Sequence, residues 1–100
     1  MKAINREVRS WHIQLKNDKS LADLSNMFNP KLRGWFAYYG RFYPSALHQI
    51  WRNINGYLVR WARRKYKRFA SHTRRAWWYL RRLAQENPRL FIHWELGCMP

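Results

Sequence analysis

Apolar side chains spaced as on one face of an α-helix are the feature that most limits how this chain can fold. From residue 47 to residue 61, leucine, isoleucine, tryptophan and tyrosine recur every three or four positions, over about four helical turns. No stretch shows the strict alternation of apolar and polar residues that is typical of a half-buried strand. The sequence therefore predicts an all-α fold.

The predicted helices form an N-terminal segment and a small bundle. Helical periodicity covers roughly residues 3–16, 20–28, 30–39, 45–67 and 73–86. We expect residues 1–19 to be a helix and linker, 20–95 to be a bundle of about four helices, and 96–100 to fray. A chain of 100 residues buries a limited apolar surface, so we expect this bundle to be marginally stable alone.

Capping residues and prolines predict where these helices begin and end. Ser20 is the expected N-cap of the first bundle helix, with Asp23 completing a capping box. Asn29 is expected to end that helix, because the residue before Pro30 is pushed away from the helical conformation. Gly40 suits the left-handed position that commonly follows the last residue of a helix.

Large apolar side chains on the helical faces are expected to form the core, because aromatic and branched residues bury the most surface. The predicted core residues are Leu32, Trp35, Phe36, Tyr39, Trp51, Ile54, Leu58, Trp61, Trp77 and Leu80.

Positive charge is the second strong feature of the sequence. The chain carries 20 Lys and Arg residues against 5 Asp and Glu residues, a formal net charge of +15, and residues 24–85 contain no acidic residue. Six Lys or Arg residues fall within 60–68 alone. Repulsion on this scale is tolerated most easily when a polyanion neutralises it. A nucleic acid is therefore the first expected partner.

The kinds of residue that carry the charge favour RNA. Arginine outnumbers lysine 14 to 6, and guanidinium groups both grip phosphate bidentately and stack on bases. Structured and single-stranded RNA is bound through such contacts and through aromatic platforms, for which Trp78 is a further candidate. The predicted RNA-binding residues are Lys31, Arg33, Tyr38, Arg41, Tyr43, Arg60, Arg63, Arg64, Lys65, Tyr66, Lys67, Arg68, Arg74 and Arg75.

Other binding partners are less favoured by the sequence. A DNA-recognition helix over 30–39 lacks asparagine and glutamine, which read base edges, in its middle. A membrane-surface protein would present one dominant amphipathic helix, whereas this chain offers several capped ones. We therefore expect no membrane association.

The sequence contains no motif that is typical of an enzyme active site. The four histidines are scattered, and the five acidic residues suggest no two-metal cluster. Cys98 is the single cysteine, which excludes an internal disulfide and a cysteine-cluster zinc site. We predict a non-enzymatic protein with no catalytic residue, metal, cofactor or small-molecule substrate. No apolar run reads as a signal peptide or a membrane span, so the predicted location is the cytoplasm, with an organelle as the alternative.

Three segments together resemble a known family. FNPKLRGWFAYYGRF, INGYLVRWARRKYKR and RRAWWYLRRLAQENPRLFIHW are similar to the maturase-specific domain, or domain X, of group II intron-encoded reverse transcriptases. The resemblance extends from about Leu21 to Trp94. Its two signatures correspond to Asn29, Pro30, Arg33, Gly34, Trp35, Tyr38 and Tyr39, and to Arg60, Trp61, Arg63 and Arg64.

The resemblance implies a helical domain that follows the thumb of a reverse transcriptase and binds structured intron RNA, promoting splicing and mobility. Residues 1–19 would then come from a thumb-like region, and a polymerase or thumb domain would be a second partner. No Tyr-Ala-Asp-Asp polymerase motif and no nuclease module occurs, which leaves a truncated or split protein, a remnant or a fragment as alternatives. The alternative function is a protein-docking module that binds nucleic acid only non-specifically.

Overall fold

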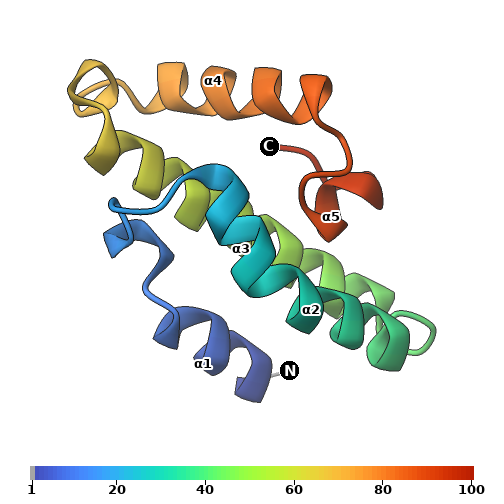
Figure 1. Cartoon of the computed structure of the whole chain (residues 1–100). Helices are drawn as coiled ribbons and strands as arrows, with labels where there is room; N and C mark the ends of the chain where they lie inside the picture. The colour runs from blue at the N-terminus through green and yellow to red at the C-terminus, as the bar shows by residue number, and fades with distance from the viewer. Residues whose placement is uncertain (1) are drawn as a thin grey trace.

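Two long helices joined by a short turn form the centre of the molecule in the computed structural model, which describes residues 2–100 (Figure 1). These residues contain helices and loops but no strand, so the predicted all-α class is confirmed. The elements are α1 (Lys2–Ser10), the 3-10 helix η1 (Ile13–Leu15), α2 (Leu21–Tyr39), α3 (Pro44–Lys65), the 3-10 helix η2 (Lys67–Phe69), α4 (Thr73–Glu86) and α5 (Ile92–Glu95).

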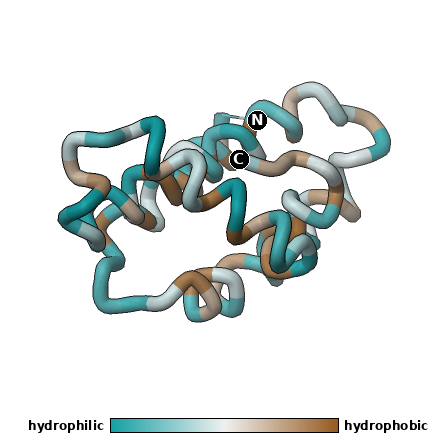
Figure 2. Tube along the Cα trace, turned by 90° about the horizontal axis from the view of Figure 1, so that it is seen from above, coloured by the Kyte–Doolittle hydropathy of each residue, from teal (hydrophilic) through white to brown (hydrophobic). Residues whose placement is uncertain are grey.

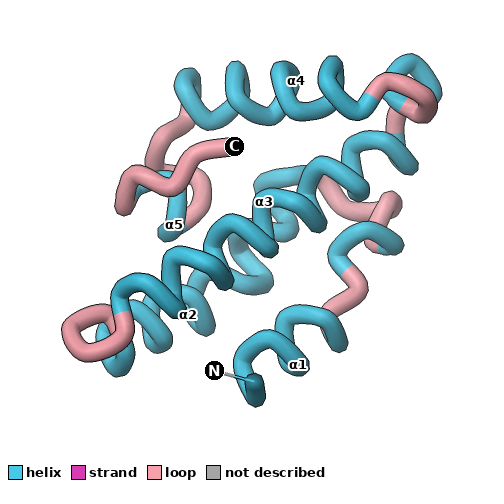
Figure 3. The backbone as a smooth tube through the Cα atoms, turned by 180° about the vertical axis from the view of Figure 1, so that it is seen from behind, coloured by secondary structure: helices cyan, strands magenta, loops and turns pink. Residues whose placement is uncertain are grey.

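α3 is the element against which most others pack. It contacts α1, η1, α2, η2 and α4. In the view from behind, α3 crosses the whole molecule, with α4 on one side and α1 on the other (Figure 3). Pro44 opens α3 at a position where its missing N–H costs nothing. At the other end of α3, its C-terminal turns lie beside η2 and the start of α4 (Figure 1).

The buried face of α3 agrees with the predicted stripe. Trp51, Ile54, Leu58 and Trp61 are all buried, and Leu80 of α4 is buried in the same core. Hydrophobic and hydrophilic residues follow one another closely along the trace (Figure 2), as expected for helices that bury one face and expose the other.

α2 is longer than predicted, because it continues through Pro30. The capping box is confirmed: Asp23 N donates to Ser20 Oγ at 3.1 Å, and Ser20 N donates to Asp23 Oδ2 at 3.0 Å. The prediction that Asn29-Pro30 ends the helix is wrong. Asn29 instead reaches across the fold, donating to Leu90 O at 2.8 Å and accepting from Ile92 N at 3.1 Å.

Two other predicted helix boundaries are corrected by the structure. The N-terminal helix ends at Ser10 rather than near residue 16. His12 adopts a left-handed conformation with φ of 49°, which interrupts the helix, and the chain then forms η1. Gly40 is right-handed, with φ of −60°, rather than left-handed. Glycine is nevertheless favoured at position 40, because the Cβ of any other residue would lie 2.6 Å from Phe36 O.

The far half of α2 is less buried than predicted. Leu32 is fully buried, whereas Trp35 and Tyr39 are half-buried, and so is Trp77 of α4. Phe36, a predicted core residue, is 44% exposed and is corrected to a surface position. Phe36 lines a surface hollow together with Leu47 of α3 and Leu96 of the C-terminal segment, which leaves its ring partly open to solvent.

The C-terminal segment packs onto α2 and α3. Phe91, Ile92 and Trp94 are buried, and Cys98, within the tail expected to fray, is 7% exposed. The tail therefore lies against the core at this point, while the division of the chain at residues 19 and 95 stays a prediction. No helix within residues 2–100 has the length and apolar character needed to cross a bilayer.

Candidate nucleic-acid interface

Two arginine pairs on α4 flank its exposed tryptophan. The inner face of the helix is set by Ala76, Leu80 and Ala84, which recur every four residues and are all buried. The sequence RRAWWYLRR then places the arginines, two helical turns apart, on the outer side. The exposed residues of this surface are Arg74, Arg75, Trp78, Arg81 and Arg82.

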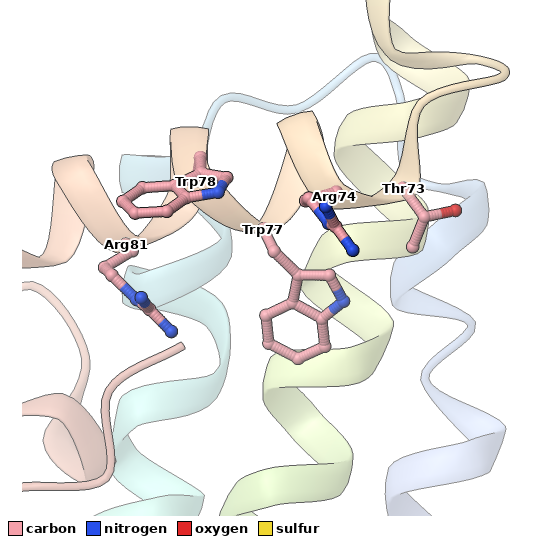
Figure 4. A pocket seen from close by; sticks show the side chains of 5 residues that line it. All are labelled: Thr73, Arg74, Trp77, Trp78 and Arg81. Carbon is pink, nitrogen blue, oxygen red and sulfur yellow. The ribbon is translucent and has the colours of Figure 1, made fainter.

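The first of two hollows on this surface lies along α4, whose residues form its whole lining. It measures about 540 Å³ and is lined by Thr73, Arg74, Trp77, Trp78 and Arg81. Figure 4 shows the Trp77 ring extending from α4 towards α3, between the side chains of Arg74 and Arg81, while Trp78 lies along the outside of the helix. The hollow therefore has an aromatic floor and a cation on either side.

The second hollow lies on the other side of Trp78. It measures about 670 Å³ and is lined by Arg68, Phe69, Arg75, Trp78, Tyr79, Arg81, Arg82 and Gln85. The guanidinium of Arg68 lies 4.8 Å from the centre of the Phe69 ring and 5.6 Å from that of Tyr79, within cation–π range. Burial, together with a hydrogen bond to Tyr66, raises the pKa of Tyr79 to about 12. Its phenol therefore adds no negative charge at neutral pH.

Arg81 belongs to both hollows and is held in place. Its Nε donates to Pro100 O at 3.0 Å, and its Cζ lies 5.2 Å from the centre of the Trp78 ring. A guanidinium carries five N–H donors, so the other four stay available for an anion. An arginine that is positioned beforehand loses less side-chain freedom on binding than a free one.

A third basic hollow lies at the C-terminal end of α3. Arg60, Arg63 and Arg64 line it together with Gln14 and Ala70. The structure thus brings these three predicted RNA-binding residues together. Arg63 also has a structural contact, because its Nη2 donates to Ala70 O at 2.8 Å and braces the connection between α3 and α4.

Two predicted RNA-binding side chains are engaged within the protein. Lys65 Nζ donates to Lys19 O at 2.7 Å and lies 5.0 Å from the centre of the Trp61 ring. Tyr66, expected to be an exposed platform, is half-buried and lies edge-on to Phe69 and Tyr79. Lys67, the first residue of η2, is exposed and makes no ion pair within the described residues 2–100.

Four of the five remaining predicted residues lie towards the opposite end of the α2–α3 hairpin. Tyr38, Arg41 and Tyr43 are exposed near its turn, with Tyr38 75% exposed, and Arg33 is exposed about two helical turns before it. α3 has 22 residues, a length of about 33 Å, so these side chains are far from α4. Lys31 lies nearer the middle of α2 and pairs with Glu7 at 3.3 Å.

Apart from Lys31, the structure therefore places the predicted RNA-binding residues at two ends of the molecule. It also adds Arg81 and Arg82, which the sequence-based prediction omits. Their repeat of the Arg74-Arg75 pair seven residues later is the signal that could have identified them, because positions i and i+7 share a face. No group of metal-ligating side chains occurs anywhere in the described range of 2–100.

Comparison with known families agrees with the sequence motifs. A family model described as "Group II intron, maturase-specific domain" matches residues 1–83. This confirms the family that the motifs indicated, although the match begins before Leu21 and ends before Trp94. The early start agrees with the packing of Ile4, Val8 and Ile13 in the same core. No curated protein and no solved structure matches the chain significantly.

Proposed function

We propose, because this chain belongs to the family of group II intron maturase-specific domains, that it binds folded intron RNA and stabilises the form that splices. The chain's own contribution is non-catalytic: it neutralises phosphates and contacts bases, while the RNA carries out the reaction. The observation that supports this most strongly is the gathering of Arg68, Arg74, Arg75, Arg81 and Arg82 around two hollows with aromatic floors.

The positive charges of these arginines are not balanced by ion pairs within the described residues, which favours the binding of an anion. Within residues 2–100, the two ion pairs join Lys19 to Asp18 and Lys31 to Glu7, and neither involves α4. Like charges that share one side of a short helix repel one another, and salt screens this repulsion only in part at such distances. Phosphates placed between them replace this repulsion with charge-assisted hydrogen bonds.

A protein-docking function is the second candidate, and one observation favours it. The last turn of α2 and the turn that follows it expose four aromatic side chains, with Phe42 72% and Tyr43 57% exposed. We call Phe36, Tyr38, Phe42 and Tyr43 the aromatic tip. Aromatic residues are enriched where proteins bind other proteins, and a polymerase or thumb domain is the partner expected from the family resemblance.

Binding measured over a salt series tests the proposal. The chain is titrated into labelled group II intron RNA and into an unrelated RNA of equal length. Neutralising ~6 phosphates predicts a slope of about −4 for the logarithm of affinity against the logarithm of salt concentration. Tighter binding to the intron RNA supports the proposed function.

A matched pair of variants locates the surface. Arg75→Gln with Arg82→Gln removes two charges from α4 and should reduce the magnitude of the slope by about one for each phosphate that is no longer neutralised. Arg6→Gln with Arg9→Gln removes two exposed charges from α1 and should leave the slope nearly unchanged. A flat salt response would overturn the proposal. Equal affinity for both RNAs would favour the docking function.

A further inference from the structure

We propose that the indole of Trp78 holds one unpaired RNA base, with the flanking arginines of α4 gripping the phosphates on either side. The site would select looped or single-stranded RNA over continuous duplex. This inference rests on the proposed function, since it names the kind of RNA that the α4 surface takes.

The exposure of Trp78 is the first observation. Its side chain is 60% exposed, although its neighbour Trp77 is half-buried against the fold. An exposed apolar residue alone is ordinary, but an indole surrounded by cations is a stacking platform, because every base has a π-face. Arginine next to the ring adds a second planar group on which a base can lie.

The position of Trp78 between the two hollows is the second observation. Trp78 and Arg81 line both of them. The pairs Arg74–Arg81 and Arg75–Arg82 each span seven residues, about 10.5 Å along the helix axis. A strand that crosses the indole therefore meets a cation before it and another after it, on whichever side of Trp78 it passes.

The fixed position of Arg81 is the third observation. The hydrogen bond from Arg81 Nε to Pro100 O holds the guanidinium beside the indole before any ligand arrives. This arrangement resembles a prepared phosphate contact rather than a mobile surface charge, because the remaining donors keep the planar fork that matches a phosphate.

The preference for an unpaired base follows from geometry. In a duplex both faces of each base are covered by its neighbours, so an indole on a helix surface reaches a base face only after unstacking. A base in a loop or single strand offers its face without that cost. A duplex would still meet the arginines, but Trp78 would contribute little.

The experiment compares two RNAs of equal length and phosphate number, one an unstructured single strand and one a fully paired hairpin. Fluorescence anisotropy measures the affinity of the full chain and of the variants Trp78→Ala and Trp78→Phe. Trp78→Ala should weaken single-strand binding by about 5-fold to 150-fold and duplex binding by about twofold or less. Trp78→Phe should keep most of the affinity, because it keeps a ring. Thermal melting by circular dichroism checks that both variants fold.

The outcomes separate this inference from the proposed function. If Trp78→Ala weakens both RNAs equally, or neither, while Arg75→Gln with Arg82→Gln still weakens them, the chain binds RNA but the base-stacking site is wrong. If the unaltered chain binds neither RNA, the proposed function fails as well. Trp78-dependent binding to vesicles of anionic phospholipid, without a Trp78 effect on RNA, would assign the indole to a membrane and overturn the inference.

Discussion

Asn55, buried on α3, accepts a hydrogen bond from Trp94 of the C-terminal segment, with 2.8 Å between Asn55 Oδ1 and Trp94 Nε1. The same oxygen lies 2.7 Å from His93 Nε2, which must therefore carry the imidazole proton. Asn55 Nδ2 donates to Cys98 O at 3.1 Å. A single amide thus joins α3 to α5 and to the chain after it.

Replacing Asn55 by leucine should lower the free energy of unfolding by about 2–4 kcal/mol. The buried donors of Trp94 and His93 would lose their acceptor, and each unsatisfied buried group costs about 1–3 kcal/mol. Urea denaturation followed by circular dichroism measures the change. Asn53→Leu, on the exposed side of the same helix, is the matched control. It loses only exposed hydrogen bonds with Gln49 and Asn5, which water can replace, and should shift stability by about 0.5 kcal/mol or less. Equal effects of the two substitutions would contradict the role of Asn55.

His93 should make stability depend on pH. Burial lowers the pKa of His93 to about 3, whereas the imidazole of an unfolded chain has an ordinary pKa of about 6.5. Between these two values the unfolded chain binds a proton that the folded chain does not. Stability should therefore fall as pH drops from about 6.5 towards 3, with a limiting slope of ~1.4 kcal/mol per pH unit.

Urea denaturation at about pH 7, 6 and 5 measures this slope above the range where carboxylates titrate. His93→Gln keeps an N–H donor for Asn55 but cannot be protonated, so it is the control. The slope should be clearly smaller in His93→Gln than in the unaltered chain. The same slope in both proteins would assign the pH dependence to other groups.

The behaviour of Asn29 and Pro30 shows what periodicity alone could not reveal. Local chemistry predicted a helix end, since a proline inside a helix costs roughly 3 kcal/mol. The structure keeps one helix because Phe28 and Leu32, on either side of the proline, are buried. Asn29 also forms hydrogen bonds with Leu90 and Ile92, which lie 61 and 63 positions later in the chain. Such contacts depend on the whole fold. The carbonyl of Asn26, which loses its helical donor, belongs to an exposed residue and can bind water.

At the candidate site, too, contacts between residues distant in the sequence could not be predicted from local patterns. The sequence identified its charges and placed α4 at the observed residues, 73–86. It could not tell a free cation from an engaged one, because the acceptor of Lys65 is the carbonyl of Lys19, 46 positions earlier. Nor could it show that Tyr38 and Tyr66 lie towards opposite ends of α3.

Two glycines of the α2 region should respond in opposite ways to alanine. Gly40→Ala should lower stability, because its Cβ would lie 2.6 Å from Phe36 O and would force the turn to shift. Gly34→Ala should raise stability by about 0.5–1 kcal/mol, since Gly34 is in the helix interior and its Cβ would meet nothing within 4 Å. Thermal melting of the two variants measures both effects. Higher melting temperatures for both variants would show that the backbone at Gly40 relaxes freely, and lower ones for both would contradict the prediction for Gly34.

Arg63 and Arg64 are neighbours with equal charge and should separate folding from RNA binding. Arg63→Gln removes the hydrogen bond to Ala70 O and should cost about 1 kcal/mol, a fall in melting temperature of about 4–8 °C for a domain of this size. Arg64 is exposed, so Arg64→Gln should leave the melting temperature unchanged and weaken RNA binding in low salt. Paired melting and salt-series measurements test both variants. An unchanged melting temperature in Arg63→Gln would show that its hydrogen bond to Ala70 contributes nothing, and Arg63 would then be as free for phosphate as Arg64.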